Sequence, residues 1–511
     1  MNQVETGKAP LMQRMLDVVE RVGNRVPHPV MIFVILIGIV IVLSQILYWI
    51  GASVSYQVIN PYTDQIEYRT TTARGLLSVD GVRFMFTGVV QNFMNFNAVG
   101  VIIVAMVGVG VAESTGLIGA LIRKLVVVAP PAALTYLLVL VGILSSIAAD
   151  AGYLVLIPLA AAAFVSVGRH PLAGLAAAFA AVAAAFLVNI LITPTDGILT
   201  EITNDAIHLV DPQVSIDLTA NVWFSIASVI MLTVVITLVT ERMIEPRLGL
   251  YRGDYRVEEG NGLSVDEYRG LRHALYGLIG VILLVAILTL PPGAPLREPE
   301  TGAIIGNTPF MTSLIVTIAL VSLVCGIAYG LGAKTMQSID DVMAAMTKAI
   351  AGLSGLILLL LVIAQFLAFF NYSNMATLAA VSLADLLSRA NLDALWLLIG
   401  FVIVVLLLDF LITGAIAKWA IFAPIFVPLL MRLDVEPEAV LAAYRVGDSP
   451  VNVITPLNAY FAMIVTFAQK YQPDSGVGTV IALMLPYVIV LSLLWTLLLV
   501  AWHLLSLPWG L

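Results

Sequence analysis

The sequence is poor in the residues that soluble enzymes use for chemistry. Only 11% of its 511 residues are charged, it has a single cysteine, Cys325, and its five histidines show no metal-ligand spacing. A lone cysteine excludes an intrachain disulfide. Nucleotide-binding loops, zinc motifs and nucleophile elbows are also missing, which argues against an ATP-driven pump or a membrane enzyme. No basic patch suggests a nucleic-acid partner. We therefore expect no enzymatic activity and no cofactor, with a bound sodium ion as the one candidate.

Hydrophobic residues dominate instead, at 60% of the chain. No soluble domain can bury so much apolar surface, so the sequence predicts an all-α polytopic membrane protein surrounded by lipid. A helix needs about 20 apolar residues to cross a bilayer. Runs of that length predict about nine transmembrane helices, at 28–50, 99–118, 172–192, 222–240, 273–291, 310–331, 350–370, 438–468 and 478–506.

Two further apolar stretches, 128–168 and 394–430, are too long for one helix. Small polar residues interrupt each of them near its middle, SSIAADAG at 145–152 and TGAIAK at 413–418. Each stretch is either two spans or one re-entrant helical hairpin, and both choices return the chain to the side that it left. We interpret them as two hairpins.

Lysine and arginine fix the orientation of the chain. With the N-terminus inside, sixteen of them fall in inside loops and six in outside loops, which is the bias of the positive-inside rule. The first residues lack a cleavable signal, so we expect an uncleaved cytoplasmic N-terminus. Segment 51–98 and residues 375–391 then lie outside, the first as interfacial structure or a subunit contact and the second as an amphipathic surface helix.

A near-identical phrase interrupts one helix in each half of the chain. It reads NILITPTDG at 189–197 and NVITP at 452–456, after a hairpin in both cases. The hairpins open from opposite sides, which indicates an inverted repeat with two broken helices, near 189–197 and 448–458. The expected organisation is a cytoplasmic N-terminal segment (1–27), a first half (28–240), a cytoplasmic linker (241–272) and a second half (273–511).

The broken helices provide a candidate cation site. Pro194 and Pro456 remove backbone donors and free carbonyl groups one turn earlier. Four oxygen-bearing side chains lie close to these prolines in the sequence, Asn189, Thr193, Asn452 and Thr455. Oxygen-rich surroundings suit a small hard cation such as sodium, and the half-helix N-termini favour a carboxylate. The alternative is that each break is a mere helix kink.

Charged residues in apolar surroundings are the next candidates, because an ionised side chain at bilayer depth normally faces a partner or a wet cavity. Arg445 and Asp448, at i and i+3, could simply neutralise each other. Alternatively Arg445 grips a substrate carboxylate while Asp448 binds a cation or proton. Asp196 directly follows its proline break and is a candidate cation ligand or proton carrier.

The two hairpins add less specific candidates. Asp150 lies at the first hairpin tip, where it is either functional or merely solvated. Asp409 and Lys418 are nine residues apart across the second break, so they could pair between its arms, and Asp409 could carry a cation or proton. Trp419 could stack on an aromatic ligand, although a lone tryptophan is more often a packing residue or an interfacial anchor.

The second half contains three long phrases, AKWAIFAPIFVPLLMRL (417–433), AAYRVGDSPVNVITPL (442–457) and FAQKYQPDSGVGTVIALMLPY (467–487), and the first half contains SSIAADAGYLVLIPLAAAAF, GRHPLAGLAAAFA and TPTDG. Together these phrases resemble the AbgT family of bacterial inner-membrane transporters. The resemblance implies uptake of p-aminobenzoyl-glutamate or efflux of sulfonamide antimetabolites. It also implies dimers of nine-helix subunits with two hairpins, related to elevator-type carriers. The residues that such transporters need fall on Asp196, Trp419, Pro437, Arg445, Asp448 and Pro456.

The chain departs from the family pattern at several positions. Family members usually have Asn at the position of Asp409 and Ser at the position of Ile416. They also usually have Gly and Ser residues in the first-half helix where this chain reads AAVAAAFLVN (180–189). An extra carboxylate and missing hydroxyl groups would change both cation coordination and pocket size. We therefore expect a secondary active transporter driven by a proton or sodium gradient, with a passive channel or facilitator for small organic anions as the alternative.

Overall fold

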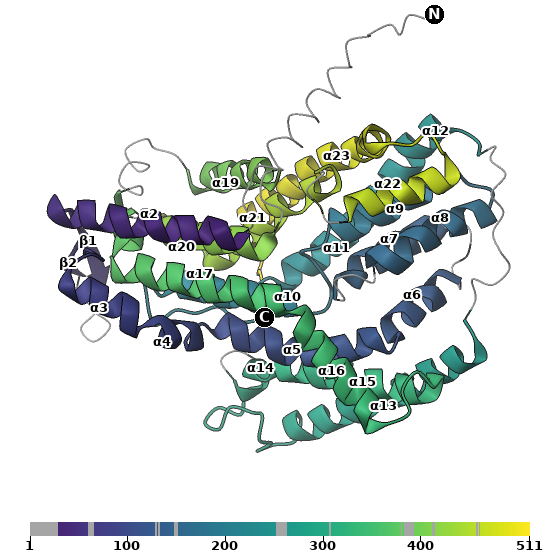
Figure 1. Ribbon diagram of the computed structural model, residues 1–511, viewed down its shortest axis with the longest axis horizontal. Coiled ribbons are helices and arrows are strands. Elements are labelled where there is room, and N and C mark those ends of the chain that lie inside the picture. The colour runs from purple at the N-terminus through teal and green to yellow at the C-terminus, as the bar shows by residue number, and fades with distance from the viewer. Residues whose placement is uncertain are drawn as a thin grey trace, which may run out of the picture.

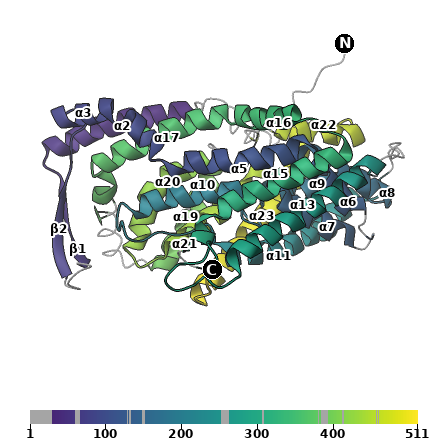
Figure 2. The same ribbon diagram turned by 90° about the horizontal axis from the view of Figure 1, so that it is seen from below.

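The fold is almost entirely helical. The computed structural model describes residues 29–59, 66–127, 130, 133–147, 152–251, 263–305, 308–379, 381–382, 393–410, 414–455, 458 and 460–511. Within these ranges the strands are β1 (Ser53–Ile59) and β2 (Ile66–Thr72), an antiparallel pair with Ser53 opposite Thr72. The hairpin that they form projects at one end of the molecule (Figure 2). The predicted all-α membrane class is confirmed.

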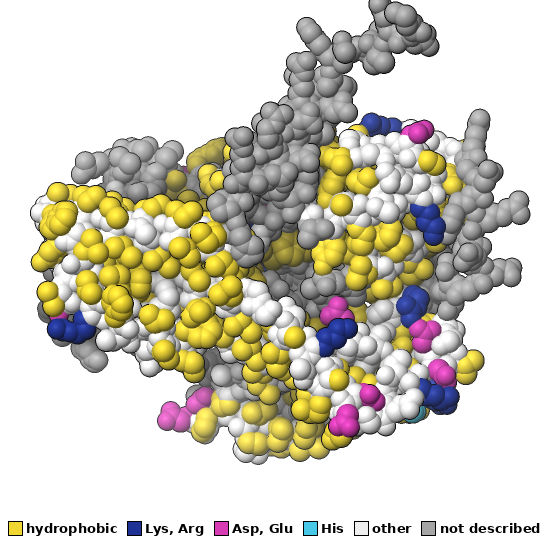
Figure 3. Space-filling model, in the orientation of Figure 1, with side chains coloured by type: hydrophobic (Ala, Val, Ile, Leu, Met, Phe, Trp, Pro, Cys, Tyr) yellow, Lys and Arg dark blue, Asp and Glu magenta, His cyan; other side chains and the backbone are white. Residues whose placement is uncertain are grey.

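Seven helices of the described ranges are long and apolar enough to cross a membrane. They are α2 (Pro29–Trp49), α5 (Asn97–Ser114), α11 (Val222–Val239), α13 (Val265–Thr289), α15 (Leu314–Ala333), α17 (Ser354–Tyr372) and α23 (Val477–Leu504). The helical path of α11 continues through a π-helical turn into α12 (Glu245–Leu248). Hydrophobic side chains cover much of the surface over α2 and α17, as Figure 3 shows, which suits contact with lipid.

The other two predicted spans are divided. Where one helix is predicted at 172–192, α9 (Pro171–Ala183) ends early and α10 begins only at Pro194, running to Ile207. Where one is predicted at 438–468, the structure has α21 (Pro437–Asp448), a 3₁₀ turn and then α22 (Phe461–Tyr471). The nine-span count and the inverted repeat stay predictions.

The predicted hairpin stretches contain pairs of shorter helices. The first holds α7 (Leu134–Leu144) and α8 (Ile157–Ser166), and the second holds α19 (Ala394–Asp409) and α20 (Ala415–Met431). Residues 148–151 of the first predicted tip, including Asp150, fall outside the described residues, as do residues 411–413 at the second tip, Pro456 and most of 375–391. The remaining helices are short: α3 (Val79–Thr87), α4 (Val89–Met94), α6 (Leu117–Val127), α14 (Pro309–Thr312) and α16 (Ile339–Gly352).

The helices form two groups that meet at α10 and α5. In the first group α15 packs between α5 and α13, and α16 packs on α5; these helices lie together in Figure 1. In the second group α9 packs on α7, α8 and α11, while α19 packs on α21. Every residue of α9 is buried, because its alanine-rich sequence lets neighbouring helices approach closely. α10 contacts both α5 and α20, so it connects the two groups.

Candidate functional site

The N-terminus of α10 is built by its own sequence. Pro194 occupies the first helical position, where its missing N–H has no intrahelical partner to lose. Thr193 and Asp196 form a capping box: Asp196 Oδ2 accepts from the Thr193 backbone N–H at 2.7 Å and from its hydroxyl at 2.8 Å, and Thr193 Oγ1 accepts from the Asp196 N–H. One carboxylate oxygen of Asp196 is thereby committed to the cap. The other, Oδ1, is available for a second partner.

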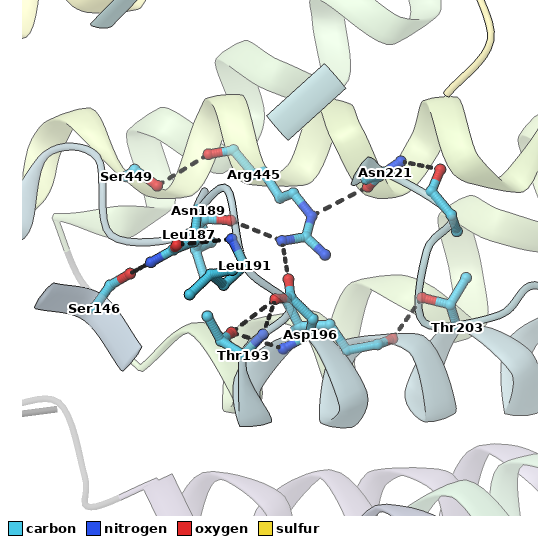
Figure 4. Close-up of polar contacts among 12 residues, drawn as sticks. Ser146, Leu187, Asn189, Leu191, Thr193, Asp196, Thr203, Asn221, Arg445 and Ser449 are labelled. Atoms are coloured by element: carbon cyan, nitrogen blue, oxygen red, sulfur yellow. Dashed lines mark hydrogen bonds and ion pairs between the residues drawn. The ribbon is translucent and has the colours of Figure 1, made fainter. Parts of the chain in front are cut away.

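Arg445 of α21 supplies that partner. Its Nη1 donates to Asp196 Oδ1 at 2.6 Å and to the Leu187 carbonyl at 2.7 Å, and its Nε donates to Asn221 Oδ1 at 3.1 Å (Figure 4). The Arg445 side chain is only 3% exposed. The guanidinium therefore joins the two interrupted helices through residues 249 positions apart. The alternative prediction that Arg445 simply neutralises Asp448 is wrong, because both residues have other ionic partners.

Asp448 belongs to a second buried ionic cluster. Lys418 Nζ pairs with Asp409 Oδ1 and, at 2.6 Å, with Asp448 Oδ1, and all three side chains are 0% exposed. The predicted pairing of Asp409 and Lys418 between the helices of the second hairpin stretch is confirmed. The hydroxyl of Tyr444 lies 2.8 Å from Asp448 Oδ1 and also contacts the Ala415 carbonyl. We call Asp409, Lys418 and Asp448 the carboxylate–lysine triad.

The triad and the first break differ in how well they fit a cation. Asn189 Oδ1 accepts from the Leu191 N–H, and its Nδ2 donates to Ser146 Oγ at 3.0 Å, so this amide ties the break to the end of α7. Thr193 Oγ1 is used by the cap. By contrast, Asp409 Oδ2 and Asp448 Oδ2 are buried oxygens without a hydrogen-bond partner among the described residues. Buried unpartnered carboxylate oxygens are suitable ligands for a sodium ion or a proton.

The predicted residues around the second break are placed close to the triad. Asn452 Nδ2 donates to the Asp448 carbonyl at 3.0 Å, and the Asn452 carbonyl accepts from Asn458 at 2.9 Å. Thr455 is buried. Pro437 starts α21, the helix that carries both Arg445 and Asp448, so it sets where that helix begins.

Trp419 is placed as a packing residue rather than beside an open ligand cavity. Its side chain is 0% exposed, and its Nε1 donates to the Leu199 carbonyl at 3.2 Å and to Thr203 Oγ1 at 3.0 Å. Its ring lies 4.6 Å from the ring of Tyr444. The predicted stacking on an aromatic ligand is therefore not what this conformation shows: the indole connects α20 with α10 and α21.

The space beside the Arg445–Asp196 pair is small. Its free volume is about 10 Å³, room for about one water molecule. Its polar lining consists of Asn189, Asp196, Asn221, Ser225 and Arg445. No substrate of the size of an amino acid fits there, so binding requires the interrupted helices to separate.

Sequence reasoning missed Asn221 and Tyr444. Asn221 accepts a hydrogen bond from the Arg445 guanidinium and donates one to the Glu438 carbonyl at 2.9 Å. It therefore links the guanidinium to the first turn of α21, the helix that carries Arg445. The only signal for it is an amide directly before the apolar run of α11, a pattern that also marks ordinary helix starts. Tyr444 has no distinguishing signal, because a tyrosine in an apolar run usually packs in the core.

Comparison with known proteins agrees with this arrangement. Residues 14–511 match the pattern of the AbgT putative transporter family. The chain is 34% identical over 494 residues to the p-aminobenzoyl-glutamate transport protein of Escherichia coli (strain K12), covering 96% of this chain and 95% of that protein.

Two solved structures are similar over nearly the whole chain. The YdaH transporter of Alcanivorax borkumensis is 40% identical, with 95% of this chain and 100% of that chain covered and a TM-score of 0.88. MtrF of Neisseria gonorrhoeae, described with a class of antimetabolite efflux pumps, is 37% identical, with coverages of 96% and 97% and a TM-score of 0.90. The chain therefore belongs to the AbgT family and is a multi-pass membrane transporter, not an enzyme.

Proposed function

We propose that this transporter is a secondary active carrier of p-aminobenzoyl-glutamate or related aromatic dicarboxylates, and that it can export sulfonamide antimetabolites. The relative from Escherichia coli is named for the first substrate, and MtrF is associated with antimetabolite efflux. We expect it in a bacterial inner membrane, as a homodimer with a cytoplasmic N-terminus. The direction of net transport then follows from the imposed gradients.

The observation that carries the proposal is the pairing of the buried Arg445 with Asp196 beside a small space. A guanidinium in a desolvated site binds a carboxylate strongly and with fixed geometry. The glutamyl end of the substrate would take the place of Asp196 Oδ1 on Arg445 when the interrupted helices separate. Asp196 would then close the site again after release, because its own pairing with Arg445 competes with the substrate.

The carboxylate–lysine triad is the proposed site of ion coupling. Asp409 Oδ2 and Asp448 Oδ2 are the buried oxygens that would hold a sodium ion or a proton, which would supply the positive charge that the triad lacks. Asp448 and Arg445 lie one turn apart on α21. A rearrangement of α21 therefore affects the substrate site and the triad together, which is what coupled transport requires.

Proteoliposome transport tests the proposal, with labelled p-aminobenzoyl-glutamate and with sodium and proton gradients imposed separately. Accumulation above equilibrium under one gradient is the expected result, and it identifies the coupling ion. Equilibration under every gradient would instead support a passive channel or facilitator for small organic anions. If p-aminobenzoyl-glutamate does not move but a sulfonamide or another dicarboxylate accumulates, the substrate assignment is wrong and the carrier mechanism stands.

A further inference from the structure

A groove of about 770 Å³ lies between α6 and α13, in the helix group that does not contain the Arg445–Asp196 pair. Two sequence patterns create it. Leu117, Leu121 and Lys124 lie on one face of α6 at i, i+4 and i+7, while Tyr268, Arg272 and Leu275 follow each other on α13 at i, i+4 and i+7. Each helix thus contributes apolar side chains to the same groove, with Lys124 from α6 and Arg269 and Arg272 from α13.

Two cations in or near the groove are already neutralised. Arg123 pairs with Glu267, and Arg269 pairs with Asp266 while its Nε donates to the Gly332 carbonyl at 2.9 Å. The Arg123–Glu267 pair and the Arg269–Gly332 hydrogen bond hold the charged end of α13 against α6 and α15. The charges of Arg123 and Arg269 are thus compensated within the protein.

Lys124 and Arg272 differ from Arg123 and Arg269 in their ionic partners. Both are exposed, and neither forms an ion pair within the described ranges of the chain. Among the described residues, two positive charges without an ion-pair partner thus line this groove beside its apolar side chains. Charged side chains gather toward the right-hand end of the face in Figure 3, the side on which Figure 1 places α6.

The rest of the groove is lined mainly by apolar side chains, several of which are exposed at the surface. Leu121 and Leu275 are 44% and 51% exposed, and only 17% of the apolar window of α13 is buried. Leu278 and Cys325 continue the apolar lining. A hydrocarbon chain would cover these side chains, whereas water would leave them unfavourably hydrated.

We propose that this groove binds an anionic phospholipid, with the phosphate between Lys124 and Arg272 and an acyl chain against Leu121, Leu275 and Leu278. Basic groups beside an apolar groove between membrane helices match a lipid headgroup and its tail at once. Arg272 can hold the phosphate through two N–H groups, and Lys124 adds a point charge. The site is separate from the substrate site, so the proposal does not depend on the transported compound.

Lipid binding to the purified full-length protein, counted by native mass spectrometry, tests this. The probes are phosphatidylglycerol and phosphatidylcholine with identical acyl chains. We expect phosphatidylglycerol to bind roughly tenfold tighter or more, since each basic residue contributes about 1 kcal/mol to the attraction. The Lys124→Gln/Arg272→Gln double variant should lose that preference. Both residues are exposed, so the variant should unfold at the wild-type temperature in lipid-free detergent.

The matched control is Arg242→Gln/Lys348→Gln, which removes the same charge from exposed positions that do not line the groove. It should keep the preference for phosphatidylglycerol. Equal binding of the two lipids to the wild type, or equal loss in both double variants, would overturn the proposal.

Two other outcomes would assign the groove to a different occupant. Full competition by glycerol phosphate would show a site for free phosphate. A loss of dimer mass in the Lys124→Gln/Arg272→Gln variant would assign the groove to a second copy of the chain.

Discussion

Arg445 is the residue whose partners matter most, because three groups from three parts of the chain hold its guanidinium. Replacing it by Ala removes the proposed carboxylate anchor and leaves Asp196, 15% exposed, with only its capping contacts. We expect p-aminobenzoyl-glutamate binding to be lost and the unfolding free energy to fall by about 3 kcal/mol or less, since breaking a fully buried pair costs 3–5 kcal/mol. Binding and thermal unfolding of the purified variant measure the two effects.

The double variant Asp196→Asn/Arg445→Ala separates stability from function. It removes the orphaned charge, so its unfolding temperature should recover relative to Arg445→Ala while binding stays absent. Wild-type affinity in either variant would contradict the anchor role.

Trp419 gives a second residue-scale prediction. Trp419→Phe keeps an aromatic ring against Tyr444 but removes the indole N–H that donates to Leu199 and Thr203. We expect the unfolding free energy to fall by about 1–2 kcal/mol and the substrate affinity to remain unchanged. A tenfold loss of affinity at an unchanged unfolding temperature would place the indole on the substrate instead.

Asp409 gives a third prediction at the scale of single residues. Asp409→Asn restores the residue usual in the family at this position and leaves Lys418 paired with Asp448. The triad then loses one negative charge, so the dependence of transport on sodium or proton concentration should change. Asp340→Asn, an exposed position on α16, is the control and should leave the ion dependence at the wild-type value. An unaltered dependence in Asp409→Asn would show that this carboxylate is a bystander.

Single residues could be chosen from the sequence, but a partner could be assigned only where it lies close in the sequence. A charge in an apolar run indicates that some partner exists. The Asp409–Lys418 pair was predictable because nine residues separate its members. Arg445 was assigned to Asp448 or to a ligand, whereas its partner, Asp196, is 249 positions away. Only the packing of α10 against α21 brings them together.

At the scale of elements, the close crossing of α5 and α15 depends on glycines, of which Gly108 makes the tightest contact. A Cβ atom at Gly108 would collide with the backbone carbonyl of Ala319, which cannot move aside, whereas Gly100 of the same helix has nothing within 4 Å. Gly108→Val should therefore separate α5 from α15 and cost about 1–3 kcal/mol or prevent folding. Gly100→Val should be close to neutral. Detergent-solubilised yield and unfolding temperature measure both, and equal effects would contradict a tight crossing.

The start of α10 could be predicted from the sequence, whereas the hydrogen-bond partners at the break before it could not. The ITP phrase at 192–194 falls where α10 begins, because proline suits the first helical position and Thr193 with Asp196 caps the helix. The sequence suggested freed carbonyls at this break. The structure shows instead that the cap and Asn189 use the available side-chain oxygens, a result that depends on the neighbouring end of α7.

For the whole molecule, the membrane class followed directly from hydrophobic composition, whereas the span count did not. The divided helix α9 is as apolar as the continuous ones, whereas α10 carries Asp196, Glu201 and Asp205. Helix breaks depend on tertiary partners that a hydropathy window does not contain.

The predicted topology can be tested on the whole protein in cells. In a Cys325→Ser background, Thr301→Cys should react with a membrane-impermeant maleimide from outside. Gln337→Cys should react only after permeabilisation. Both positions are exposed and lie at opposite ends of α15. The reverse labelling pattern would show that the N-terminus faces outward, contrary to the distribution of lysine and arginine.

The carboxylate–lysine triad also has an electrical consequence. With both aspartates ionised and Lys418 protonated, the triad carries one net negative charge in a region without water contact. Moving one charge through the whole membrane potential changes the free energy by about 2.3 kcal/mol per 100 mV. If the triad moves across the field, its bare form therefore contributes one negative charge to the voltage dependence of that step, whereas a bound sodium ion or proton cancels this contribution. The charge of the triad would then add to the voltage dependence of the step in which its cation site is empty, and the charge of an anionic substrate would add to the step in which the substrate is carried.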